Sequence, residues 1–62
     1  MKISDYIILT MKNSNSAYVE LENREFECSR NTGECLMAYA KEKYTLVGVI
    51  RNLIGDVKYI FN

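Results

Sequence analysis

The chain has 62 residues, of which 48% are hydrophobic, and its eight basic residues balance its eight acidic residues. This length allows one small domain, residues 1–62, and the hydrophobic content excludes a disordered tail. The neutral total counts against a general nucleic-acid binder, because such proteins normally carry a surplus of positive charge.

The first half of the chain predicts three strands. Residues 6–11 (Tyr-Ile-Ile-Leu-Thr-Met) are rich in strand formers and are typical of a buried strand. Residues 13–16 have the composition of a turn. Polar and apolar residues then alternate from Ala17 to Cys28 on both sides of Asn23-Arg24, which predicts a β-hairpin with one face in water.

This hairpin carries a cluster of glutamates. Folded about Asn23-Arg24, it places Glu22 opposite Glu25 and Glu20 opposite Glu27 on the wet face. Like charges directly opposite one another weaken a hairpin, so the cluster requires an explanation. One explanation is a solvated face whose charge is relieved by Lys or Arg of a neighbouring strand. The other is a docking face for a basic protein surface, formed by Tyr18, Glu20, Glu22, Glu25 and Glu27.

A helix is predicted next. The segment from Glu34 to Lys43 consists mostly of good helix formers, and Asn31 with Glu34 resembles a capping box. Gly33 is expected to supply a positive φ in the turn that precedes this helix. The alternative makes Gly33 a hairpin bulge and residues 34–40 a strand.

The remaining segments predict two more strands. Residues 44–50 change abruptly to β-branched residues and predict a central strand, although a helix from Leu46 to Ile54 is an alternative. Residues 57–61 predict the last strand, with Tyr59 facing the core, and this strand is also a candidate edge for pairing with a second copy. Between them, Leu53-Ile54 stand in a turn, where they either fold under the sheet or contact a partner.

Together these elements predict an α+β fold, a small antiparallel sheet of about five strands with one helix packed on it. If the helical segment were a strand, five short strands would instead form a small all-β barrel. A domain this short buries only about 60% of its unfolded surface, so we expect reinforcement by self-association and predict a homodimer.

Residues suited to catalysis or metal binding are scarce. The chain has no histidine, which removes the commonest general base and neutral metal ligand, and it is too short to enclose a pocket easily. Cys28 and Cys35 cannot close a four-ligand zinc site by themselves. We expect them to be small buried hydrophobes, with a disulfide as the alternative. The sequence therefore predicts no enzymatic activity, no metal and no cofactor.

Composition also bears on origin and location. Phe, Tyr, Met, Ile, Asn and Lys total 27 residues, whereas Gly, Ala, Arg and Pro total 9. This bias towards AT-rich codons points to a low-GC bacterium, one of its phages or an archaeal virus. No secretory pattern or membrane-length apolar run is visible, so we expect a cytoplasmic protein that does not engage a membrane.

These features favour a protein-binding module, specifically a phage or mobile-element inhibitor that occludes a surface of a host or cellular protein. One alternative is a small nucleic-acid-binding regulator that uses its sheet, its tyrosines and the basic residues Lys41, Lys43, Arg51 and Lys58. The other alternative is a structural subunit of a larger assembly.

Overall fold

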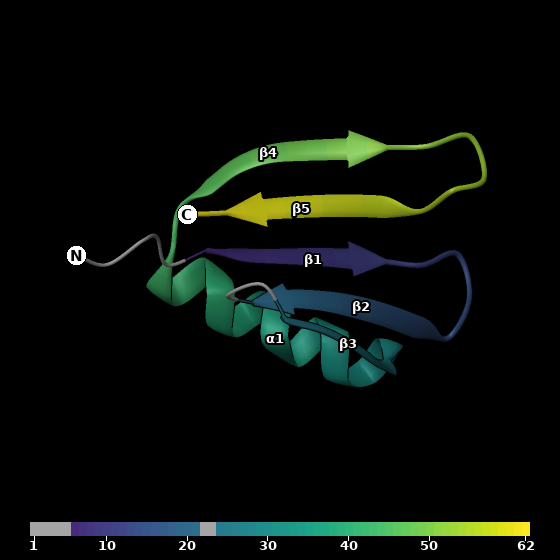
Figure 1. Ribbon diagram of the computed structural model, residues 1–62, viewed down its shortest axis with the longest axis horizontal. Helices are drawn as coiled ribbons and strands as arrows, with labels where there is room; N and C mark the ends of the chain where they lie inside the picture. The colour runs from purple at the N-terminus through teal and green to yellow at the C-terminus, as the bar shows by residue number, and fades with distance from the viewer. Residues whose placement is uncertain (1–5, 22–23) are drawn as a thin grey trace.

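The computed structural model describes residues 6–21 and 24–62, which form five strands and one helix. The elements are β1 (Ile7–Met11), β2 (Ser16–Leu21), β3 (Arg24–Ser29), α1 (Arg30–Lys43), β4 (Leu46–Arg51) and β5 (Val57–Phe61). All strand pairs are antiparallel, and the strands lie in the order β3-β2-β1-β5-β4 (Figure 1). The sheet is open, so the predicted α+β fold is confirmed and the barrel alternative is wrong.

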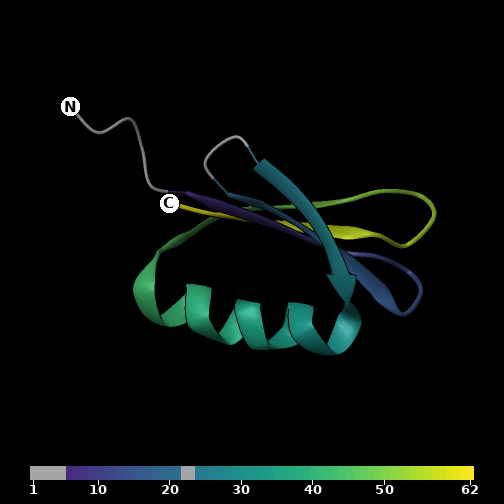
Figure 2. The ribbon, with the colours of Figure 1, turned by 60° about the horizontal axis from the view of Figure 1, so that its bottom comes forward.

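The core lies between α1 and one face of the sheet. The helix contacts β1, β2 and β3 and leaves the other face uncovered (Figure 2). The buried side chains come mainly from alternate positions of β1 and β2, and are Ile7, Leu9, Met11, Ala17, Val19, Ala40 and Phe61. The half-buried Tyr59 packs against this core, as its position in the last strand predicted. The prediction of a buried first strand is also confirmed, since β1 lies in the middle of the sheet.

The helix begins earlier than its composition suggested. Ser29, rather than Asn31, is the N-cap, and its Oγ accepts a hydrogen bond of 3.2 Å from the backbone N–H of Thr32. The backbone of Ser29 is extended (φ −73°, ψ 159°), so β3 leads directly into the helix. The predicted helix is therefore confirmed with its start moved from Glu34 to Arg30, because the Ser29 hydroxyl accepts one of the free N–H groups of the first turn.

Gly33 serves close packing instead of a turn. It is buried within α1, where a Cβ atom would lie 2.8 Å from Cβ of Ala17 and 3.2 Å from Sδ of Met11. Carbon atoms rest about 3.5–4.0 Å apart, so only glycine lets the helix approach the sheet this closely. The expected turn with a positive φ is wrong at this position.

The C-terminal hairpin occupies positions in the sheet that the sequence did not predict. Residues 57–61 form β5 as predicted, and β4 is a strand, so the helical alternative is wrong. β4 was expected in the centre of the sheet and is an edge strand. β5 was a candidate edge strand and lies between β1 and β4. A run of β-branched residues favours a strand without specifying its neighbours. A bulge shifts the pairing between Leu46 and Gly48, and Gly55 adopts a φ of 98° in the turn.

Two turns at the same end of the sheet are joined by polar contacts. The backbone N–H of Asn13 donates to Oδ1 of Asp56 at 2.9 Å, and Nδ2 of Asn13 donates to the carbonyl oxygen of Ile54 at 2.8 Å. Nζ of Lys12 lies 3.7 Å from Oδ2 of Asp56. The hydrogen bond from Asn13, followed by one from Asn52 and the charge of Lys12, lowers the pKa of Asp56. These contacts hold the β4–β5 hairpin beside β1.

Candidate functional site

The uncovered face of the sheet carries the acidic cluster that the sequence predicts. Glu20 lies opposite Glu25, and Tyr18 lies opposite Glu27. Directly opposed residues of an antiparallel pair share a face. The two β2 residues alternate with residues buried beneath α1, so all four belong to the side away from the helix. We call this surface, Tyr18, Glu20, Glu25 and Glu27, the acidic face.

The register of this hairpin differs from the prediction. Glu20 is opposite Glu25 rather than Glu27, and Leu21 is opposite Arg24. A shift of two positions leaves every residue on its original face, and the alternation therefore could not distinguish the two registers. Glu22 lies outside the described residues, and its place on the acidic face stays a prediction.

The carboxylates of the acidic face make no ion pair with the basic residues that the structure describes. Glu25 and Glu27 are exposed, whereas Glu20 is half-buried and accepts a hydrogen bond of 3.3 Å from the hydroxyl of Tyr6. Within residues 6–21 and 24–62, no lysine or arginine forms an ion pair with these three glutamates. The guanidinium of Arg24 instead lies over the ring of Phe26, 5.8 Å from its centroid. In the part of the chain that the structure describes, the acidic face is therefore a cluster of carboxylates without a paired base.

Charge changes sign across the uncovered face. Tyr18 is half-buried, and Nζ of Lys12 lies 5.1 Å from the centroid of its ring, within the range of a cation–π contact. The row that begins with Glu27 and Tyr18 continues through Thr10 on β1 to Lys58 on β5. The face is therefore acidic near β3 and basic near β5.

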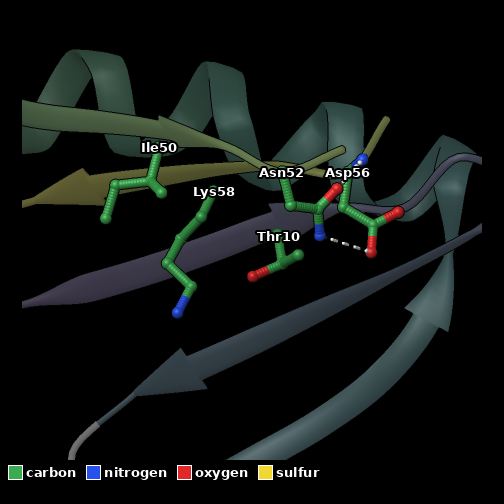
Figure 3. Close-up of a pocket in the computed structure, with 5 residues that line it drawn as sticks. All are labelled: Thr10, Ile50, Asn52, Asp56 and Lys58. Atoms are coloured by element: carbon green, nitrogen blue, oxygen red, sulfur yellow. Dashed lines mark hydrogen bonds between the residues drawn. The ribbon is translucent and has the colours of Figure 1, made fainter. Parts of the chain in front are cut away.

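An open pocket of about 230 Å³ lies at the basic end of this face (Figure 3). It is lined by Thr10, Ile50, Asn52, Asp56 and Lys58. Nδ2 of Asn52 donates to Oδ2 of Asp56 at 3.4 Å, and the same carboxylate joins the two turns. Small-molecule sites usually occupy about 300–1,000 Å³, so this hollow is better described as part of the turn structure than as a substrate pocket.

The two cysteines are not bonded to each other. Both thiols are free, with Cys28 half-buried against the core and Cys35 exposed on α1. The disulfide alternative is therefore wrong in this structure, and the expectation of a buried side chain is wrong for Cys35. In the part of the chain that the structure describes, no group of three or more cysteine, aspartate and glutamate residues is arranged to hold a metal ion. No helix in that part is long and apolar enough to cross a membrane.

A second exposed surface lies at the opposite edge of the sheet. Six of the eight large hydrophobic residues that are exposed in the described residues belong to β4 and the turn after it, and we call them the apolar edge: Leu46, Val47, Val49, Ile50, Leu53 and Ile54. The turn residues Leu53 and Ile54 are 106% and 68% exposed. The sequence analysis predicted that Leu53 and Ile54 either fold under the sheet or contact a partner. It did not predict the exposed strand beside them, because β4 was expected in the centre of the sheet.

The basic residues of the C-terminal half do not gather on one surface. Lys41 and Lys43 lie in the last turn of α1, and Lys58 lies on the uncovered face of β5. Arg51 pairs with Val57 in the row that continues to the buried side of β1, so it belongs to the helix side of the sheet. A nucleic-acid strand would find no continuous basic stripe among these residues.

The candidate site therefore consists of two surfaces at opposite edges of one sheet, the acidic face on β2 and β3 and the apolar edge on β4 and its turn. All residues of the apolar edge are exposed, as are Glu25 and Glu27 of the acidic face. Comparison with protein-family models, with curated proteins and with solved structures found no match to this chain.

Proposed function

We propose that this chain is a protein-binding module that covers a basic surface of a partner protein with its acidic face. The proposal is carried by one observation, the grouping of Glu20, Glu25 and Glu27 around Tyr18 with no ion pair to a described basic residue. Directly opposed glutamates reduce the stability of a hairpin. A favourable interaction with a partner therefore explains these glutamates better than a contribution to folding does.

The dimensions of the acidic face favour a partner surface that normally holds nucleic acid. Neighbouring strands lie about 4.8 Å apart, and alternate residues on one strand lie about 6.8 Å apart, which is comparable to the spacing of successive phosphates. A groove shaped for a phosphate backbone would therefore meet charges of the same sign at similar intervals. Tyr18 adds a large, rigid contact surface of the kind common at protein interfaces.

In this proposal the chain is a phage or mobile-element inhibitor that acts in the cytoplasm of its host, as a homodimer and without catalysis. The absence of histidine from the chain and the small, open pocket support a role in binding rather than in chemistry. Electrostatic complementarity mainly accelerates association and sets specificity. Binding should therefore weaken steeply as the salt concentration rises.

The test is a charge reversal with a matched control. The double variant E25K/E27K reverses the two exposed carboxylates of the acidic face, and E34K/E42K makes the same change in net charge on exposed positions of α1. Each protein is immobilised and exposed to lysate of a low-GC bacterium, and the captured proteins are identified by mass spectrometry. We expect wild type and E34K/E42K to capture the same basic protein, and E25K/E27K to lose it while keeping its circular dichroism spectrum.

Two results would count against this proposal. If E25K/E27K still captured the same protein, the acidic face would not be the contact surface. If E34K/E42K lost it equally, net charge alone would explain binding. Repeating the capture with the purified partner at low and high salt then measures the electrostatic part of the affinity.

A further inference from the structure

The two edge strands of the sheet differ in how they are protected against pairing. β3 carries the charged residues Arg24, Glu25 and Glu27, and charges of this kind discourage the addition of another strand. β4 has neither charge nor proline between Leu46 and Ile50, and its four large side chains in that stretch are 43–60% exposed. An unprotected edge with these properties is a template for strand pairing.

Among the described residues, no hydrogen bond is made to the backbone groups on the free side of β4. The N–H of Asn52 donates to the carbonyl oxygen of Asp56 at 3.2 Å, which marks this pair as hydrogen-bonded. Hydrogen-bonded and non-hydrogen-bonded pairs alternate along an antiparallel ladder. Ile50 therefore directs its N–H and C=O towards β5, whereas Val49 and Arg51 direct theirs away from the sheet.

We propose that β4 pairs with β4 of a second copy of this chain, antiparallel and about a two-fold axis at Val49. In this register the outward backbone groups of Val49 bond to the same residue of the second copy, and Arg51 lies beside Val47. On the helix side of the sheet the two Val49 side chains meet. On the uncovered face Ile50 lies opposite Gly48, where the missing side chain leaves room for it.

The exposed surface of the apolar edge comes close to the area that one partner contributes to a standard interface. Its six exposed fractions sum to nearly four fully exposed aliphatic residues. That is on the order of 600 Å², which approaches the roughly 800 Å² that each partner contributes to an interface of standard size. The two-fold axis also places the turn of each copy beside the beginning of β4 of the other, so Leu53 and Ile54 are covered as well.

Charge favours a second copy as the occupant of this edge. The chain has no net charge, so two copies do not repel one another as a whole. The single charge of β4, Arg51, lies opposite the apolar Val47 in the proposed register, and no like charges meet. The acidic faces lie near β3, at the far ends of the resulting ten-stranded sheet. This interface specifies the homodimer proposed above and does not depend on the acidic face.

A charge swap at the axis tests the interface. Because Val49 meets itself, V49K places two lysines opposite each other and V49E places two glutamates there. We expect each variant alone to dissociate at least about tenfold more readily than wild type, and an equimolar mixture to recover the dimer. Sedimentation velocity reports the mass, which for the dimer is twice the 7.2 kDa of the chain.

A variant at the other edge provides the control. Phe26 on β3 is 47% exposed and Val49 is 43% exposed, so F26K adds the same charge at a similarly exposed position. F26K should remain dimeric, and circular dichroism should show that all variants are folded. The proposal is overturned by a monomeric wild type, by a V49K dimer, by a mixture that stays monomeric, or by loss of the dimer in F26K. The E25K/E27K variant should stay dimeric, so failure of the capture experiment and failure of this one are separate results.

Discussion

Replacing Gly33 with alanine should destabilise the protein, although alanine is the better helix former. The substitution favours the helix by about 1 kcal/mol. The new Cβ, however, would lie 2.8 Å from Cβ of Ala17, roughly 1 Å closer than carbon atoms normally pack. Overpacking of this kind costs about 1–3 kcal/mol. The net effect is a loss of up to about 2 kcal/mol in the free energy of unfolding.

Urea or thermal unfolding followed by circular dichroism measures this loss. For a domain of about this size, 1 kcal/mol corresponds to a change in Tm of roughly 4–8 °C. The closest contact can be removed by also replacing Ala17 with glycine, which deletes the Cβ at 2.8 Å and leaves Sδ of Met11, at 3.2 Å, as the remaining close neighbour. In the A17G background, G33A should therefore raise stability, because the flexible Met11 side chain can move aside by a few tenths of an ångström and the helix propensity of alanine then decides the sign.

The decisive observation is that G33A lowers the free energy of unfolding in the wild-type background and raises it in the A17G background. If G33A stabilised the protein in the wild-type background, the helix would not pack on β2 as closely as the structure shows. If G33A had the same effect in both backgrounds, the contact between Gly33 and Ala17 would not be the cause of the loss.

Two further predictions concern the helix cap and the joined turns. S29A should lower the free energy of unfolding by about 1 kcal/mol, because the backbone N–H of Thr32 loses its acceptor, whereas S29D should retain most of the stability in urea unfolding. The hydrogen bond from Asn13 lowers the pKa of Asp56 below its ordinary value of 3.8. The stability that this contact adds to the folded state is therefore present above 3.8 and is lost as the pH falls through the pKa of the folded state. D56N should therefore remove this part of the acid sensitivity when Tm is measured against pH, and an unchanged profile would contradict the assigned contacts.

The charges of β3 account for two properties of the molecule together. Glu25 and Glu27 form part of the acidic face, and they also discourage pairing at that edge of the sheet. β4 has no charged residue before Arg51 at its end, so the two edges are suited to different contacts. In the proposed dimer the unprotected edges pair with each other and the acidic faces point to opposite ends. A dimer of this shape presents two equivalent docking faces.

Local patterns in the sequence were sufficient to predict the elements and the faces of the strands. The alternation from Ala17 to Cys28 predicted a hairpin, and its faces were assigned correctly. The absence of β-branched residues from 34–43 predicted the helix, and residues 57–61 predicted β5 with the observed bounds. These features depend on backbone preferences and on a side-chain period of two, which neighbouring residues are enough to specify.

The register, the strand order and the exposed edge were decided by the tertiary structure. A slip of two residues preserves every face, so the pairing of Glu20 with Glu25 was not visible in the alternation. The sequence around Gly33 is typical of a turn, and only the contact of the helix with Ala17 explains the glycine. The β-branched run of β4 suits a central strand equally well, and it lies at an edge because β5 pairs with β1. Such long-range pairings depend on which elements bury the core together, and the residues of a single strand do not specify its neighbours.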